Sequence, residues 1–223
     1  MEKKLKCWFE TLGDKEKPDE FDAKQLVKLY SIKVPKGKRL GPKDELNIDD
    51  IKPPYVLKVC SSNILHKTEL KGVLLNNDKE CIQDNFKLMR ARFPKENILV
   101  ENQSTYRGPE FIIGIIKDPA LGHAVMVGAG GVLTEIYKDT AFRLAPCSVN
   151  DAMDMIDELV LSPVFDDFRG ISLDKRKLAQ TISQVSTLAD DLGDKLSQLD
   201  INPIVFSDGE WIALDVKVMF AEK

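Results

Sequence analysis

Residues 199–218 read LDINPIVFSDGEWIALDVKV, and this stretch predicts a β-hairpin near the C-terminus. Two runs rich in apolar residues flank the tripeptide SDG at 207–209, a sequence typical of a tight turn between strands. Successive side chains of a strand point to opposite faces, so Asp200 and Asn202 share one face of the hairpin. In this register Asp215, on the second strand, lies close to Asn202.

The oxygen atoms of these three side chains suggest a magnesium site. Mg²⁺ takes hard oxygen ligands and usually keeps water and nucleotide phosphates as its remaining ligands. A solvated sheet face with ordinary acidic residues explains the same pattern, and the spacing alone favours that explanation. The hairpin is therefore a candidate metal site that needs support from the rest of the chain.

Upstream of the hairpin, the chain from 55 to 101 predicts strand, loop, strand, helix and strand. The first strand is YVLKV at 55–59, and a polar loop over 61–72 separates it from the run VLL at 73–75. The helix shows its apolar residues at the spacing of one helix face; they are Ile82, Phe86 and Met89. The last strand, NILVE, covers 97–101.

A second group of elements follows a polar linker at 102–109. It comprises strands over 110–117 and 124–127, a helix over 148–161, a helix with the apolar residues Leu178, Ile182 and Val185, and the terminal hairpin. These elements predict an α+β fold of two lobes, residues 20–102 and 103–223.

The N-terminal part of the chain has a weaker pattern. Residues 1–19 are highly charged, and we expect a loosely held leader without an assigned role. A helix over 23–30 should follow, with Asp19 or Asp22 as its cap. Proline and glycine interrupt 33–54, which predicts an irregular connector.

Composition excludes several classes of protein. The chain has 223 residues, 43% of them hydrophobic, with 32 basic and 36 acidic residues and a net charge of −4. The sequence has no large block of Lys and Arg, so a nucleic-acid partner is not expected. The sequence has no run of about 18 apolar residues, so no membrane span is predicted. The opening residues also lack the apolar run of a secretory signal. The four cysteines are far apart, which favours free thiols in a reducing cytoplasm over zinc ligands or disulfides.

Two further positions could carry phosphate chemistry. Lys58 lies in the middle of an apolar strand, so its ammonium group either points outward or is buried with a partner such as a phosphate. His66 lies in the polar loop, and a neutral imidazole can accept a phosphoryl group. Lys67 and Lys71 beside it could hold phosphate oxygens. An outward-facing lysine and a surface histidine are the ordinary alternatives for both positions.

Three charged residues complete the candidates. Glu101 ends a strand and Glu110 begins the next segment, so both flank the linker between the lobes, a usual place for a nucleotide base and ribose. Arg143 could neutralise phosphate charge during transfer. A charged surface would explain each of the three equally well.

Taken together, five segments resemble an ATP-grasp domain, and specifically the β subunit of an ADP-forming acyl-CoA synthetase, that is, an acetate–CoA ligase (ADP-forming). They occur in the order found in the family and cover most of residues 20–218. The matching segments are FDAKQLVKLYSIKVP at 21–35, YVLKVCSSNILHKTELKGV at 55–73, LVENQSTYRGPEFIIG at 99–114, GAGGVLTEIYKDTAFRLAP at 128–146 and LDINPIVFSDGEWIALDVKV at 199–218.

The resemblance implies a two-lobed ATP-grasp fold that holds ATP or ADP between the lobes. Lys58 is similar to the strand lysine that contacts nucleotide phosphates. Glu101 matches an acid near the adenine, and Glu110 matches an acid that faces the nucleotide. Asn202 and Asp215 match the Mg²⁺ ligands of the family.

His66 matches the second phosphorylated histidine of this subfamily, and Asp200 matches an acidic position that orients a phosphohistidine or binds metal. The implied reaction is acyl-CoA + ADP + phosphate ⇌ carboxylic acid + ATP + CoA. The resemblance implies a partner, a CoA-binding α subunit that carries its own phosphohistidine, in an α2β2 heterotetramer. One departure is Lys71, which stands where the family has a glycine.

Two alternatives remain open at this point. Another ATP-grasp carboxylate ligase, such as a succinyl-CoA synthetase β-like subunit, would keep the nucleotide and metal residues but leave His66 without a role. A non-catalytic nucleotide-sensing subunit would keep the fold without the chemistry.

Overall fold

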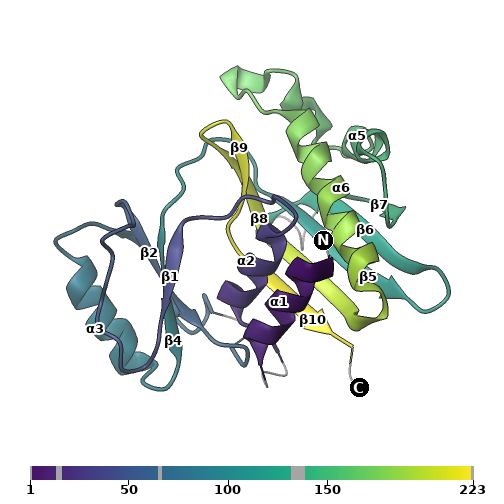
Figure 1. Ribbon diagram of the computed structural model, residues 1–223. Coiled ribbons are helices and arrows are strands. Elements are labelled where there is room, and N and C mark those ends of the chain that lie inside the picture. The colour runs from purple at the N-terminus through teal and green to yellow at the C-terminus, as the bar shows by residue number, and fades with distance from the viewer. Residues whose placement is uncertain (1, 14–16, 65–66, 132–138, 222–223) are drawn as a thin grey trace. The chain divides into compact units, whose positions relative to one another are not determined.

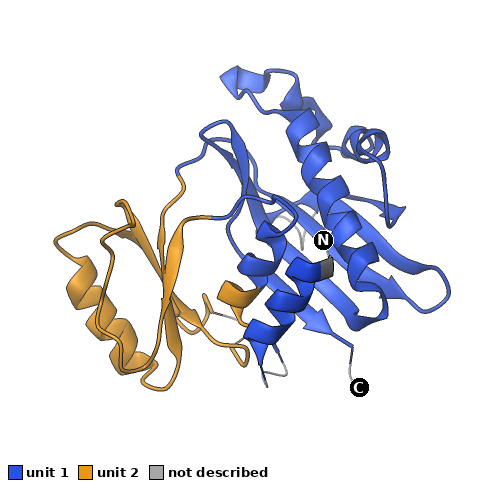
Figure 2. Ribbon diagram, viewed as in Figure 1, with its two compact units in different colours: residues 1–18, 23–34, 105–223 blue, residues 19–22, 35–104 orange. Residues whose placement is uncertain are grey.

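The computed structural model describes residues 2–13, 17–64, 67–131 and 139–221 (Figure 1). The chain divides into two compact units, shown in two colours in Figure 2. Unit 1 contains residues 1–18, 23–34 and 105–223, and unit 2 contains residues 19–22 and 35–104. Residues 23–34, which we assigned to the first lobe, therefore belong to unit 1, because the apolar side chains of this segment pack in the core of unit 1.

Unit 2 is a four-stranded antiparallel sheet with one helix. The strands are ordered β1-β4-β2-β3. Their bounds are Gly37–Leu40 for β1, Tyr55–Cys60 for β2, Val73–Asn77 for β3 and Asn97–Asn102 for β4, and α3 spans Ile82–Arg92. The strands of the segment 55–101 and its helix are as predicted, whereas β1 lies inside the stretch that we expected to be an irregular connector.

The two faces of this sheet differ in character. On one face, Tyr55 and Leu57 of β2 pack with the buried residues of α3 in a small apolar core. Lys58 alternates with them and points to the other face. Glu101 of β4 is opposite Val56 in the register, so it lies on the same face as Lys58. The face without α3 therefore carries the charged groups.

Unit 1 is built on a larger antiparallel sheet of order β10-β8-β5-β6-β7, with β9 paired to β8. The strands are β5 (Phe111–Asp118), β6 (Gly122–Ala129), β7 (Thr140–Leu144), β8 (Leu196–Ser207), β9 (Glu210–Ala213) and β10 (Val216–Phe220). The helices are α1 (Glu2–Leu12), α2 (Glu20–Lys28, whose first turn belongs to unit 2), α5 (Val149–Asp157) and α6 (Lys175–Leu192), with short 3-10 turns at Ser162–Phe165, Phe168–Gly170 and Gly193–Lys195.

Local signals account for the helices of unit 1. α5 begins at a capping box in which the side chain of Ser148 accepts the N–H of Asp151 and the Asp151 carboxylate accepts the N–H of Ser148. The side chain of Asp174 caps α6 by accepting the N–H of Lys177 at 2.8 Å. α6 buries one face against the sheet, and α5 packs beside it (Figure 1).

The prediction of a loosely held leader is wrong. α1 occupies Glu2–Leu12, and Leu5, Trp8 and Leu12 are buried in the core of unit 1. The Trp8 ring packs against Phe220 of β10, with ring centroids 6.0 Å apart. We overlooked the helix because lysines are numerous in this segment. Its apolar residues nevertheless recur at the spacing of three and four residues that is typical of one helix face.

Among the described residues, no helix is long and apolar enough to cross a membrane. All four cysteines are free thiols.

Candidate functional site

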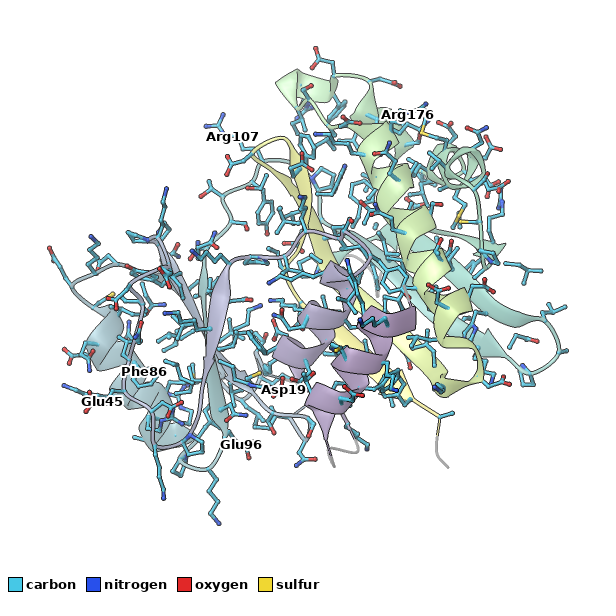
Figure 3. The ribbon with its side chains drawn as sticks, viewed as in Figure 1. Asp19, Glu45, Phe86, Glu96, Arg107 and Arg176 are labelled. Atoms are coloured by element: carbon cyan, nitrogen blue, oxygen red, sulfur yellow. The ribbon has the colours of Figure 1, made fainter. Side chains whose placement is uncertain are left out.

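The start of α2 is fixed by a network of charges in unit 2. The backbone N–H of Asp22 donates to Asp19 at 3.0 Å, and the N–H of Asp19 donates to Asp22 at 3.3 Å. The guanidinium of Arg39 on β1 bridges both carboxylates, at 2.8 Å and 2.6 Å. Asp19 is labelled at this position in Figure 3. This first turn of α2, which includes Glu20, is therefore held firmly against the charged face of the sheet.

Lys58 is buried and bound by carboxylates. Its ammonium donates to Glu20 at 2.7 Å and lies 3.2 Å from a carboxylate oxygen of Glu101. The side chains of Glu20 and Glu101 are only 4% and 2% exposed, so these ion pairs are shielded from water. The sequence left open whether Lys58 points outward or is buried, and the structure shows the buried arrangement. A buried charge of this kind needs its partners, because removing one is strongly destabilising.

Lys67 joins the same group. Its ammonium donates to the second carboxylate oxygen of Glu20 in a very short hydrogen bond. The N–H of Gly72 donates to the carbonyl of Lys67 at 2.7 Å, which closes a tight loop after Lys67. A Cβ at Gly72 would lie 2.5 Å from the Val59 side chain, so only glycine fits there. His66 lies outside the described residues.

Cys60 borders this group but carries no chemistry. Burial raises the pKa of its thiol well above the ordinary value, and the negative charge of Asp19 raises the pKa further. The thiol is therefore neutral at physiological pH, and a neutral thiol is a poor nucleophile.

In unit 1, the terminal hairpin is interrupted where Asn202 and Asp215 lie. β8 pairs with β10 up to Ile201 and with β9 from Ile204 onward. The second strand of the predicted hairpin is thus two strands, β9 and β10. The N–H of Asn202 donates to the carbonyl of Asp215 at 3.2 Å, so the two residues lie opposite each other, as we expected.

Asp200 lies beside this interruption, opposite Lys217 in the register. Burial raises the pKa of the Asp200 carboxyl; nearby Lys217 lowers it, and the negative charge of Asp215 raises it. Asp200 and Asp215 therefore interact as like charges, an arrangement that a bound cation would relieve.

A glycine segment links Asn202 to Glu110. The N–H of Gly131 donates to the side-chain oxygen of Asn202 at 3.1 Å, and the N–H of Gly130 donates to the carbonyl of Glu110 at 2.7 Å. Gly131 has a φ of +64°, and a Cβ there would overlap a carboxylate oxygen of Glu110. The hydroxyl of Tyr106 donates to Glu110 in a very short hydrogen bond. Asn202, Glu110 and Gly131 are therefore in direct proximity.

Arg143 is placed elsewhere in unit 1. It is opposite Val125, a core residue, so it points to the face of the sheet that the helices cover. Its guanidinium pairs with Glu158 at the end of α5. Asp200 alternates with the core residues Leu199 and Ile201 and points to the opposite face. The expectation that Arg143 meets phosphates receives no support from this geometry.

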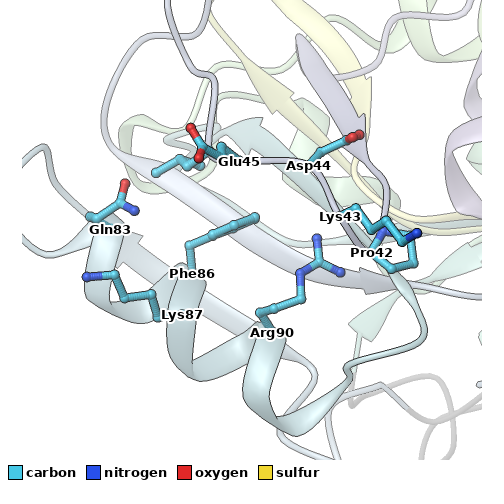
Figure 4. A pocket seen from close by; sticks show the side chains of 9 residues that line it. Pro42, Lys43, Asp44, Glu45, Gln83, Phe86, Lys87 and Arg90 are labelled. Atoms are coloured by element: carbon cyan, nitrogen blue, oxygen red, sulfur yellow. The ribbon is translucent and has the colours of Figure 1, made fainter.

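A pocket of about 380 Å³ lies in unit 2 between residues 42–46 and α3 (Figure 4). Phe86 and Arg90 line it, and Arg90 donates to the carbonyls of Gly41 and Glu96, both at 2.7 Å. α3 packs on the face of the sheet opposite to Lys58. None of the residues that the sequence proposed as a site lines this pocket.

Two polar residues that contact the candidate residues were not predicted, Glu20 beside Lys58 and Tyr106 beside Glu110. Glu20 was overlooked because an acid in the first turn of a helix is common for electrostatic reasons. Tyr106 was overlooked because it lies in an irregular linker. The pKa of its phenol is raised to about 12, mainly by burial and also by Glu110. No sequence pattern links Glu20 to its distant lysines, and none links Tyr106 to Glu110 within the irregular linker.

The donor set near the hairpin fits Mg²⁺. Asn202, Asp215 and Asp200 offer only oxygen atoms, and the Asn202 oxygen keeps a lone pair beyond the one used by Gly131. Among the described residues no three His, Cys, Asp or Glu side chains form a metal-binding group. A few protein oxygens suit a cation whose other ligands are water and phosphate.

Comparison with known proteins identifies the family. The model of the ATP-grasp domain matches residues 13–220. The β subunits of acetate–CoA ligase (ADP-forming) II and I from Pyrococcus furiosus are 34% and 36% identical to this chain, over 90% of this chain and 90% of each relative. This chain belongs to the ATP-grasp β subunits of ADP-forming acetate–CoA ligases.

Solved structures show the same fold as this ATP-grasp subunit. PH1788 from Pyrococcus horikoshii superposes with a TM-score of 0.87 at 30% identity, over 100% of both chains. An acetyl-coenzyme A synthetase of Ca. Korarchaeum cryptofilum, in complex with coenzyme A and Mg-AMPPCP and with its phosphohistidine segment pointing towards the nucleotide binding site, superposes with a TM-score of 0.83 at 25% identity, over 96% of this chain and 98% of the other. The predicted α+β ATP-grasp fold is confirmed.

Proposed function

We propose that this ATP-grasp chain is the nucleotide-binding β subunit of an ADP-forming acyl-CoA synthetase. It transfers a phosphoryl group between ADP or ATP and a CoA-binding α subunit, in the reaction acyl-CoA + ADP + phosphate ⇌ carboxylic acid + ATP + CoA. The observation that carries this proposal is the match to two acetate–CoA ligase β subunits over 90% of both chains.

Charged residues of unit 2 bind the nucleotide in this proposal. Lys58 and Lys67 hold phosphate oxygens, and the ion pair with Glu101 keeps Lys58 in place. Phosphoryl transfer depends on alignment and on neutralised charge more than on covalent activation. Two buried ammonium groups at fixed positions support that role.

Oxygen donors of unit 1 bind the metal. Asn202 and Asp215 hold Mg²⁺, and Glu110, adjacent to Gly131, faces the nucleotide. When bound, Mg²⁺ neutralises negative charge on the phosphates. Asp200 binds the metal or orients the imidazole that carries the phosphoryl group.

His66 is the phosphoryl carrier in this proposal. A ring nitrogen attacks the terminal phosphorus of ATP, an N–P bond forms, and the P–O bond to ADP breaks. In the opposite direction ADP accepts the group from the imidazole. The solved relative with a phosphohistidine segment pointing towards its nucleotide site supports this role.

The partner is a CoA-binding α subunit with its own phosphohistidine, and we propose an α2β2 assembly. The description of the relatives as β subunits supports a partner chain. The four free thiols support the cytoplasmic location that we propose, because disulfides are rare in a reducing compartment.

Phosphoryl labelling tests the role of His66. We expect the full chain, incubated with Mg²⁺ and ATP labelled on the γ-phosphate, to acquire acid-labile phosphate, and we expect H66N to acquire none. His123, the only other histidine of the chain, provides the matched control. Its Nε2 lies 2.9 Å from the carbonyl of Leu196 in the core, and H123N should still be labelled.

The same experiment separates the alternatives. Acid-labile phosphate on H66N would overturn the carrier role. Unchanged turnover of H66N together with an α subunit would favour an ATP-grasp ligase without a relay. Tight ATP binding with no ATP–ADP exchange would favour a nucleotide-sensing subunit.

A further inference from the structure

Glu20 has an arrangement that the proposed function does not use. Each of its two carboxylate oxygens binds a different lysine, Lys58 on β2 and Lys67 in the loop that follows. The Glu20 side chain is 4% exposed, and those of Lys58 and Lys67 are 10% and 8% exposed. One buried carboxylate therefore holds together both lysines that we assign to nucleotide phosphates.

The charges of Glu20, Lys58 and Lys67 depend on one another. Two ammonium groups on one carboxylate repel each other, and the negative charge between them offsets that repulsion. Lys58 lies 2.7 Å from a Glu20 oxygen and 3.2 Å from a Glu101 oxygen, so its ion pair with Glu20 is the shorter one. Loss of the Glu20 charge would therefore leave the two ammonium groups to repel each other and would release Lys67 from its position.

The backbone under Glu20 is itself held in place. Asp19 and Asp22 cap each other at the start of α2, and Arg39 binds both of them. Glu20 lies between these two acids in the same helical turn. Its carboxylate is thus a fixed point rather than a side chain that adapts to its surroundings.

We propose that Glu20 is a positioning residue that holds the ammonium groups of Lys58 and Lys67 together for the phosphates of a nucleoside diphosphate or triphosphate. The inference rests on the proposed function, since it assumes that these lysines bind the nucleotide. Glu20 acts through the two lysines and does not itself touch the phosphates.

The variant E20Q keeps the size of the side chain and removes its charge. We expect the Kd of the full chain for Mg-ADP, measured by titration calorimetry, to rise roughly tenfold or more, because the glutamine oxygen accepts from only one lysine and its NH2 group cannot bind the other. With an α subunit present, the KM for ADP should rise while the KM for acyl-CoA stays unchanged. General destabilisation would not produce that split.

Asp84 supplies the control for the loss of a negative charge. It is an exposed acid of α3 in the same unit and pairs with Lys87 at 3.6 Å. We expect D84N to bind Mg-ADP within about twofold of the wild-type chain, since α3 packs on the face of the sheet opposite to Lys58. In a K58M/K67M background, E20Q should add no further loss, because the residues through which it acts are gone.

The outcomes of these experiments test the role of Glu20 separately from the proposed function on which it rests. A wild-type chain that does not bind Mg-ADP would overturn the proposed function. A wild-type chain that binds, with E20Q binding equally well, would overturn only the role of Glu20. If E20Q does not fold, E20D keeps the charge with a shorter reach; we expect severalfold weaker binding, and wild-type affinity in that variant would also overturn the role.

Discussion

Asn202 and Glu110 owe their positions to a residue without a side chain. Gly131 donates its N–H to the Asn202 oxygen, and its Cα leaves no room for a Cβ beside Glu110. The left-handed φ of +64° is easily adopted only by glycine. A single backbone position thus holds one proposed metal ligand beside one proposed nucleotide residue.

The variant G131A should separate this role from ordinary backbone strain. The added methyl group displaces the Glu110 carboxylate and shifts the donor to Asn202, so we expect the KM for Mg-ADP to rise roughly tenfold. Gly170 is the control, because it has a φ of +73° and a Cβ added there would meet nothing within 4 Å. G170A should lower the Tm through the backbone cost alone and leave the KM for Mg-ADP unchanged. A G131A variant with an unchanged KM for Mg-ADP would contradict the prediction.

Lys71 shows the opposite case, a side chain where the backbone favours glycine. Its φ is +53°, and the family resemblance had indicated a glycine at this position. The left-handed conformation costs a residue with a Cβ about 1–2 kcal/mol. The departure from the family pattern therefore leaves the shape of the loop intact at a cost in stability.

We expect K71G to raise the free energy of unfolding by up to about 1 kcal/mol, after the greater freedom of glycine in the unfolded chain is subtracted. Urea unfolding measures this change. Lys79 is an exposed turn residue outside the set with positive φ, so K79G should be neutral or destabilising. A loss of stability in K71G would show that the Lys71 side chain contributes more than its strain.

At the scale of elements, α1 belongs to the core of unit 1. Trp8 is 5% exposed and contacts Phe9 and Phe220, whose rings lie 5.1 Å and 6.0 Å from it. These contacts join the first helix of the chain to its last strand. The charged sequence of α1 had indicated a loosely held leader, whereas its apolar residues are buried in the core.

Truncation of this contact tests the packing of α1. We expect W8A to lower the free energy of unfolding by about 3 kcal/mol, as large-to-small substitutions in a core do. Lys6 is an exposed residue of the same helix, and K6A should change stability by less than about 0.5 kcal/mol. Equal unfolding midpoints for W8A and the wild-type chain would mean that α1 is not part of the core.

The terminal hairpin carries both proposed metal ligands, Asn202 and Asp215. β8 changes partner from β10 to β9 between Ile201 and Ile204, and the register against β5 shifts at the same place. The register against β9 and β10 is the same on both sides, so Asn202 stays opposite Asp215 as in a continuous hairpin. The shift against β5 interrupts the regular ladder beside these two residues.

At the scale of the whole molecule, the residues that we propose for the nucleotide and the metal come from both units. Lys58, Lys67 and Glu101 belong to unit 2, whereas Glu110, Asn202 and Asp215 belong to unit 1. The family match covers residues 13–220 and so includes both units. In the proposed function, the lysines for the phosphates therefore belong to one unit and the oxygen donors for the metal to the other.

The sequence by itself determined the α+β class, most of the strands and helices, and the family. Apolar periodicity, turn residues and helix caps act locally, so they can be predicted without coordinates; Asp19, one of the two predicted caps, is an example. The ordered segments that carry the resemblance are likewise a property of the sequence.

Only the tertiary structure decided which charges meet. Glu20 lies 38 residues from Lys58 and 47 from Lys67, and no local pattern links an acid in a first helical turn to lysines that distant. Arg143 was assigned to phosphates by its charge, yet the strand register turns it towards Glu158. Ion pairs depend on distances in space that folding sets, whereas helices and strands depend mainly on neighbours along the chain.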